Sequence, residues 1–316
     1  MNKDYSKYCF SPITHKKLIE YYYKQRDSYW TFAEIKMDHN DRKDFLELHP
    51  NAQEFIKFVL AFFSQFDGIV NENLSINFMK VMSHIKEVSA FQFLQGAIEV
   101  IHNESYSLAT ETIIQDLDER KKILSAIENY PSIKKIAKWV EEGTSESKSF
   151  LEQLLTMMCV EGIFFSSAFC SIYWIKKSNK MRGLCKLNEF ISRDEALHTD
   201  FAIALYHHLT LVSKEMKVLD EKVIVDIITS AVEVNSEFIR DALKVELIGI
   251  NSEDMIKYVK CTADTILESL GCSRIYKIDN PFEWMIMINL TNKTNFFEDT
   301  VSEYSRPDTN EDFTFT

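Results

Sequence analysis

The sequence predicts an all-α protein on the strength of three observations. Its 316 residues include only 7 Gly and 5 Pro, well below the average usage of about 7% and 5%. No proline stands between Pro131 and Pro281, and Gly and Pro are the residues that most often interrupt regular structure. Apolar residues recur at helical spacing through most of the chain. We therefore expect helices throughout, in one large domain or two small ones.

Local signals place these helices. Pro50 precedes the first long periodic stretch, and residues 150–177 are apolar nearly all round, which predicts a helix buried on every side. Asn251 or Ser252 is the expected cap of the last helix, and Gly271 its end. The expected helices span residues 51–74, 87–114, a shorter part of 127–143, 150–177, 187–209, a part of 218–246 and a part of 251–270.

Charge and composition exclude several classes of function. The net charge of −12 and the pI near 5.2 disfavour nonspecific binding to nucleic acid, which requires clustered Lys and Arg. No run of about 18 uncharged apolar residues occurs, so we expect no membrane span. The start "MNKDYSKYCFSP" has no apolar signal core, which predicts a cytoplasmic protein. None of the six cysteines forms a C-x-x-C pair, so we expect buried thiols.

Two Glu-x-x-His pairs carry the main functional signal. Glu195 and His198 lie in "ISRDEALHTDFA", and Glu99 and His102 lie in "GAIEVIHNESYSL". Residues three apart share one side of a helix. One such pair is weak support for a site, because chance could place it on a solvated face. Two pairs in strongly apolar helices indicate a buried metal site.

Two further carboxylates stand alone in apolar helices. Asp67 lies in "VLAFFSQFDGIV" and Glu161 in "MMCVEGIFFSSAF". A lone buried carboxylate costs several kcal/mol unless it is paired or bound to a metal. Four helices with these residues and the two Glu-x-x-His pairs resemble the ferritin-like dimetal carboxylate bundle, with Asp in place of one Glu. We expect that bundle, with the metal pair in its core and extra helices around it. Oxygen and nitrogen ligands suit iron and manganese.

Tyr106 follows His102 by four residues and Glu99 by seven, so it lies on the same helix face about one turn further on. A phenol beside two metal ions can be oxidised by one electron. A buried structural tyrosine is the alternative. Beside six candidate ligands we favour the redox role.

Seven stretches resemble the small, radical-generating subunit of class I ribonucleotide reductase, of the type found in eukaryotes and large DNA viruses. They span roughly residues 10 to 305, and their combination is highly specific. The stretches are "DSYWTFAEI", "FDGIVNENL", "IEVIHNESYSL", "VEGIFFSSAF", "LNEFISRDEALHTDFA", "NPFEWM" and "LTNKTNFFEDTVSEY".

The resemblance implies a set of metal ligands and a radical site. Two iron ions per chain are expected, and a manganese-containing pair is not excluded. Tyr106 would hold a stable tyrosyl radical after O2 oxidises the reduced site. Phe165 and Phe169 match the apolar residues that shield the radical, and core packing explains them equally well. One metal would be bound by Asp67, Glu99 and His102 and the other by Glu161, Glu195 and His198, with Glu99 and Glu195 placed to bridge.

The resemblance also implies a path for the electron. Trp30 matches the tryptophan of that path, and Asp194 matches the carboxylate that links it to His102. Tyr304 matches the tail tyrosine that passes the radical to a large subunit, where ribonucleotides are reduced to deoxyribonucleotides. Without the resemblance, the sequence would favour Trp30 as an aromatic residue of the core and Tyr304 as a surface residue of the tail.

The expected organisation is one ferritin-like domain over residues 1–300 and a flexible tail over residues 301–316 that docks onto the large subunit. Phe313 and Phe315 are the expected anchors, although the ending "EDFTFT" is shorter than related tails. The resemblance implies a homodimer. Two alternatives stay open: a metal-poor auxiliary subunit that stabilises an active paralogue, and another ferritin-like di-iron oxidase or iron store.

Overall fold

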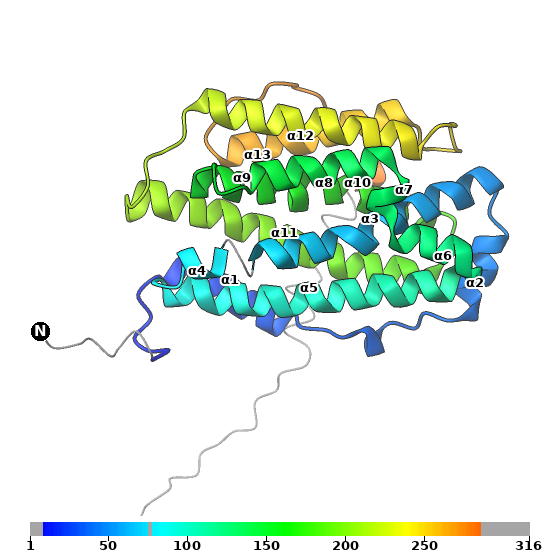
Figure 1. The fold of residues 1–316 in the computed structure, drawn as a ribbon, viewed down its shortest axis with the longest axis horizontal. Coiled ribbons are helices and arrows are strands. Elements are labelled where there is room, and N and C mark those ends of the chain that lie inside the picture. The colour runs from blue at the N-terminus through cyan, green and yellow to red at the C-terminus, as the bar shows by residue number, and fades with distance from the viewer. Residues whose placement is uncertain (1–8, 75–77, 286–316) are drawn as a thin grey trace, which may run out of the picture. The chain divides into compact units, whose positions relative to one another are not determined.

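The computed structural model describes residues 9–74 and 78–285, which are almost entirely helices and their connections (Figure 1). Within these ranges the only β-type pairing is an isolated bridge between Leu247 and Ile250. The prediction of an all-α protein is confirmed. The chain divides into two compact units, Met1–Pro281 and Phe282–Thr316, and the helices described below belong to the first. The predicted tail, residues 301–316, lies outside the described residues and stays a prediction.

Four long helical segments form the bundle that carries the candidate ligands. Within it, α3 (Pro50–Asn73) packs along α5 (Lys86–Ile113), and α10 (Phe165–Lys176) packs along α11 (Arg182–His207). All four segments occur where the sequence predicts them, although the last begins five residues earlier than expected. They are α3 (Pro50–Asn73), α5 (Lys86–Ile113), the continuous run of α9 (Phe150–Cys159), η4 (Val160–Phe164) and α10 (Phe165–Lys176), and α11 (Arg182–His207).

Further helices surround this bundle, as predicted. The helices α1 (Lys16–Asp27) and α2 (His39–Leu46) contact α5 and α11. The last two helices, α12 (Glu221–Ala242) and α13 (Ser252–Ser269), pack on each other on the side of the bundle away from α5 (Figure 1). The surrounding elements are α1 (Lys16–Asp27), η2 (Phe32–Glu34), α2 (His39–Leu46), α4 (Met79–Val81), α6 (Leu117–Leu124), α7 (Ala126–Asn129), α8 (Pro131–Gly143), η5 (His208–Val212), α12 (Glu221–Ala242) and α13 (Ser252–Ser269).

The predicted start and stop signals operate locally. Pro50 is the first residue of α3, where its missing N–H is not needed. The side chain of Asn251 accepts a hydrogen bond from the backbone N–H of Asp254 at 2.9 Å and so caps α13. Gly271 ends that helix with φ of +82°, a conformation that favours glycine.

The segment Phe150–Lys176 is the most apolar in the described part of the chain. It is long and apolar enough to cross a membrane, but 89% of the window that meets this test is buried inside the protein, as in the core helix of a bundle. The sequence predicts one uninterrupted α-helix here, and this is wrong in one detail. Residues Val160–Phe164 form a π-helical turn, a feature frequent at functional sites, and Glu161 lies within it.

The start of α11 is fixed by α2. Asp41 Oδ1 accepts a hydrogen bond from the backbone N–H of Leu184 at 3.0 Å, and Asp44 Oδ2 accepts one from Met181 N–H at 2.8 Å. These bonds satisfy backbone donors that a helix N-terminus leaves free. Gly183 lets the two elements approach, because a Cβ there would lie 2.6 Å from Asp41 Oδ2. α2 therefore sets the position of the helix that carries the second Glu-x-x-His pair.

Candidate dimetal centre

The four bundle segments bring all six predicted ligand side chains into the core. α3 contributes the aspartate, η4 contributes a glutamate, and α5 and α11 each contribute a Glu-x-x-His pair. Each side chain is buried, with exposed fractions from 0% to 5%. The residues are Asp67, Glu99, His102, Glu161, Glu195 and His198.

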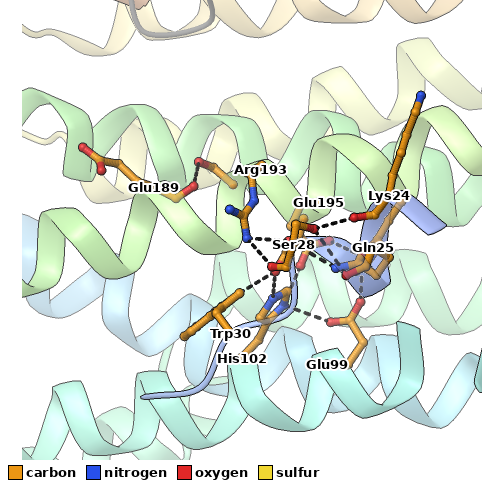
Figure 2. A network of polar contacts seen from close by, with 12 residues as sticks. Lys24, Gln25, Ser28, Trp30, Glu99, His102, Glu189, Arg193 and Glu195 are labelled. Carbon is orange, nitrogen blue, oxygen red and sulfur yellow. Dashed lines mark hydrogen bonds and ion pairs between the residues drawn. The ribbon is translucent and has the colours of Figure 1, made fainter. Parts of the chain in front are cut away.

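The two histidines turn the same ring nitrogen towards the same two glutamates. His102 Nδ1 lies 2.9 Å from Glu195 Oε1 and 3.5 Å from Glu99 Oε2. His198 Nδ1 lies 3.0 Å from Glu99 Oε1 and 3.2 Å from Glu195 Oε2. Figure 2 shows His102 between Trp30 and the carboxylate of Glu99. Glu99 and Glu195 therefore lie between the histidines, and each has carboxylate oxygens near both Nδ1 atoms.

Glu161 completes one half of this cluster. Its Oε1 accepts a hydrogen bond from Gln95 Nε2 at 3.1 Å, a partner that the sequence pattern did not reveal. One ligand atom from each of four side chains lies within 4.8 Å of the others, which is compact enough to surround a metal ion. These four are Glu99, Glu161, Glu195 and His198.

Asp67 and His102 lie outside that tightest group but interact electrostatically with its glutamates. Asp67 is fully buried, and neither of its carboxylate oxygens has a hydrogen-bond partner. Burial raises the pKa of Asp67 well above its ordinary value, and the charges of Glu99 and Glu195 raise it further, although His102 lowers it. A carboxylate left in this position without a cation is costly.

The donor set fits a pair of metal ions. Four carboxylates and two imidazoles converge in a dry interior. Several of their polar atoms have no hydrogen-bond partner. Cations bound between these atoms would compensate for the cost of burying them. Oxygen and imidazole ligands suit iron and manganese. The atoms without hydrogen-bond partners are Asp67 Oδ1 and Oδ2, Glu99 Oε1 and Oε2, His102 Nδ1 and Glu195 Oε1.

Asp194 connects His102 to Trp30. Its Oδ2 accepts a hydrogen bond from Trp30 Nε1 at 2.7 Å and one from His102 Nε2 at 3.2 Å. The indole also stacks on the imidazole, with ring centroids 5.9 Å apart. Burial alone would raise the pKa of Asp194, but His102 and Arg193 hold it below its ordinary value. An ionised Asp194 fixes His102 with Nε2 protonated, which leaves Nδ1 free for a metal.

Tyr106 lies beside the centre in a dry aromatic pocket. The phenol is fully buried, and its hydroxyl has no hydrogen-bond partner. Phe63 stacks on the ring with centroids 4.2 Å apart and an angle of 5°, and both Phe165 and Phe169 pack on Phe63. Burial, followed by the charge of Asp67, raises the pKa of Tyr106 well above its ordinary value. The phenol is therefore neutral and shielded from water.

Comparison with known proteins identifies the family. The family model described as "Ribonucleotide reductase, small chain" matches residues 7–281. The chain belongs to this family. The small chain of Dictyostelium discoideum is 46% identical over 306 residues, which cover 96% of this chain and 88% of that protein. A small chain of Plasmodium falciparum is 44% identical over 306 residues, covering 97% of this chain and 85% of that protein.

Solved ribonucleotide reductase structures share the fold. The Rnr4 homodimer of Saccharomyces cerevisiae superimposes with a TM-score of 0.77 at 29% identity and covers 94% of this chain and 89% of that one. A small-chain fold together with the buried carboxylate and histidine cluster supports a dimetal centre. The predicted ferritin-like bundle is confirmed.

A second polar residue of this small-chain centre, besides Gln95, escaped the sequence reasoning. Gln25, fully buried on α1, accepts a hydrogen bond from His198 Nε2 and donates one to Asp194 Oδ1. A signal existed, because Gln25 follows Leu18 by seven residues and so lies on the apolar face of an amphipathic helix. Tyr304, Phe313 and Phe315 lie outside the described residues, so their expected roles stay predictions.

Proposed function

We propose that this chain is the radical-generating small subunit of a ribonucleoside-diphosphate reductase and works with a separate large subunit. Membership of the small-chain family supports this, since the relatives are named as reductase small chains. The observation that carries the proposal is the convergence of six buried candidate ligands, four of them in one tight cluster, beside a buried, shielded tyrosine.

The proposed ligands divide between two ions. The geometry of the two Nδ1 atoms supports Glu99 and Glu195 as shared ligands, because each lies near both histidines. We assign two irons, because a phenol stands beside the site. When bound, the metal pair would supply, with O2, the oxidising power needed to remove one electron from Tyr106. The remaining ligands would be Asp67 with His102 at one ion and Glu161 with His198 at the other.

The surroundings of Tyr106 suit the storage of a radical. The hydroxyl of Tyr106 meets no hydrogen-bond partner in the described structure. Oxidation of the phenol also releases the hydroxyl proton, which would pass to a base at the centre, where Asp67 is the carboxylate that acts most strongly on the phenol. Phe63 stacks on the ring of Tyr106, and both Phe165 and Phe169 pack on Phe63. Exclusion of water and of reductants is the contribution that these side chains make.

The proposed exit for the oxidising equivalent begins at His102 and passes through Asp194 to Trp30, along two hydrogen bonds of 3.2 and 2.7 Å. Tyr304 in the proposed tail would continue it to the large subunit.

We further propose a cytoplasmic homodimer. Sedimentation is expected to give twice the 37.0 kDa of one chain.

The decisive experiment adds ferrous iron and O2 to metal-free protein. We expect about two irons per chain, a sharp phenoxyl absorption band and an EPR signal from a tyrosyl radical. The Tyr106→Phe variant should bind the same amount of iron and give no such signal. A Tyr106→Phe protein that kept the radical would disprove the assignment, and a wild-type chain with two irons and no radical would favour another di-iron oxidase.

A further inference from the structure

Gln25 links the two halves of the metal centre through a single amide. His198 Nε2 lies 3.1 Å from Gln25 Oε1, and Gln25 Nε2 lies 3.2 Å from Asp194 Oδ1. An amide oxygen only accepts hydrogen bonds and an amide nitrogen only donates them. The imidazole must therefore donate to Gln25, and Gln25 must donate to the carboxylate.

The amide extends the chain of bonds already described at Asp194. That carboxylate accepts from Gln25 on Oδ1 and from His102 and Trp30 on Oδ2, while Arg193 approaches Oδ1 at 3.4 Å. Figure 2 shows Gln25 on α1 reaching into the same network as Trp30 and His102. The outward-facing nitrogens of both candidate metal-binding histidines thus belong to one continuous set of hydrogen bonds.

We propose that Gln25 is a positioning residue that couples the two metal-binding histidines. It holds His198 with Nε2 protonated, so that Nδ1 faces Glu99 and Glu195. It also fixes the carboxylate of Asp194 in the orientation that serves His102 and Trp30. This inference rests on the metal site proposed above and adds a residue that orients both halves of it.

The chemistry of position 25 requires an amide. A carboxylate there would face the carboxylate of Asp194 in a dry interior, and Lys or Arg has no acceptor for the histidine N–H. Leucine would fill similar space but leave the Nε2–H of His198 without a partner and Asp194 Oδ1 with Arg193 alone. Groups that orient metal ligands in this way commonly change metal affinity by about 10- to 100-fold when they are removed.

The two histidines differ in the charge of their partner. His102 donates to the ionised Asp194, whereas His198 donates to the neutral amide of Gln25. A carboxylate partner raises the basicity of an imidazole ligand more than an amide does. The two metal positions are therefore inequivalent, and loss of Gln25 should act most strongly on the ion bound by His198.

The test compares Gln25→Leu with Gln92→Leu. Gln92 is a buried amide on α5 that, among the residues described, makes no hydrogen bond to either histidine, so its replacement controls for the loss of a buried amide. Each protein is labelled with 15N-histidine and 15N-tryptophan and loaded with diamagnetic Zn²⁺. Co²⁺ titrations of the metal-free proteins measure affinity and stoichiometry through visible absorption.

We expect Gln25→Leu to shift the Nε2–H resonance of His198 and the indole N–H resonance of Trp30. One Co²⁺ should bind about 10- to 100-fold more weakly. Gln92→Leu should leave both resonances and both affinities as in the wild type. Should Gln25→Leu fail to fold, Gln25→Met is used instead, because methionine is flexible and fills irregular core space.

Two results would overturn the inference. Wild-type protein that binds two Co²⁺ per chain, together with a Gln25 variant whose resonances and affinities are unchanged, contradicts the role of Gln25 alone. Wild-type protein that binds no Co²⁺ contradicts the proposed metal site and, with it, the role of Gln25.

Discussion

At the residue scale, the proposed centre depends on the hydrogen bond that each histidine ring, His102 and His198, makes through Nε2. Both rings turn Nδ1 inward to Glu99 and Glu195 because both Nε2 atoms are held from outside, by Asp194 and by Gln25. Metal ligands that are fixed in this way lose little freedom when an ion binds.

Asp194 is the residue of this network most sensitive to a change of charge. Replacement with Asn introduces an N–H₂ group among donors from Trp30, His102 and Gln25, where only acceptors fit. We expect Asp194→Asn to lower the free energy of unfolding by about 1–3 kcal/mol and to weaken metal binding by about 10- to 100-fold. Denaturant unfolding and Co²⁺ titration measure the two effects. The exposed Asp118→Asn is the control, and equal effects in both variants would refute the role of Asp194.

The six candidate ligands could be picked out from the sequence because charged and ligating residues stand out against apolar helices. Glu161 and Asp67 were each isolated in such a stretch, and the two Glu-x-x-His pairs share one spacing. The amides Gln25 and Gln95 stand out less, since a neutral polar residue on the apolar face of a helix, such as Gln25 on α1, is a weaker signal than a charged one. Their functional relevance follows only from tertiary contacts across 169 and 66 residues.

At the element scale, the site depends on the residue at which α11 begins and on the π-helical turn η4, which carries Glu161. The sequence placed the start of α11 at residue 187, but it begins at Arg182, because Asp41 and Asp44 of α2 cap it from far away in the sequence. The π turn of η4 could not be predicted either, because the sequence signals of helices mark where a helix begins and ends and do not report its winding. Local patterns predict helices, whereas contacts between helices decide these details.

Gly183 tests how closely α11 packs against α2 and the segment that precedes it. A Cβ at this position would lie 2.8 Å from Met37 Cα and 2.9 Å from the carbonyl oxygen of Lys36, and backbone atoms cannot move aside easily. We expect Gly183→Ala to lower the free energy of unfolding by about 1–3 kcal/mol. In Gly68→Ala, on α3, the nearest atom is 3.8 Å away, so that variant should be neutral or more stable by up to about 1 kcal/mol. Equal unfolding midpoints would contradict the close packing.

At the scale of the whole molecule, the metal centre places a cluster of ionisable groups in the core of the fold. Burial raises the pKa of both Asp67 and Glu161 well above the ordinary value. Burial lowers the pKa of His102 and His198, but the surrounding carboxylates outweigh it and raise both pKa values. Groups with a raised pKa in the folded state stabilise it at low pH and lose that contribution as pH rises through the raised value.

The metal-free protein should therefore become less stable as the solution becomes more alkaline. Ordinary pKa values are about 4 for carboxyl groups and about 6.5 for imidazole. Between about pH 6 and pH 9 we expect the free energy of unfolding to fall by about 2 kcal/mol or more. Glu99, whose pKa is lowered chiefly by its two histidine partners against the effect of burial, acts in the opposite sense and only at lower pH.

Chemical denaturation of metal-free protein across this pH range measures the effect, and the Asp67→Asn variant should show a weaker pH dependence. Bound metal should remove most of it, because the carboxylates are then ligands. Metal at a thousand times its dissociation constant should also add about 4 kcal/mol of stability per site. A metal-free protein that grew more stable towards pH 9 would contradict this description of the core.

The central claim is that six side chains from four segments of the bundle hold two ions beside Tyr106. Anomalous diffraction from crystals grown with Mn²⁺ or Fe²⁺ tests it most directly. We predict two peaks per chain, about 3.5–4 Å apart as in other two-metal sites, with Glu99 and Glu195 contacting both. A single peak, or ions bound away from the core and clear of both histidines, would contradict the claim.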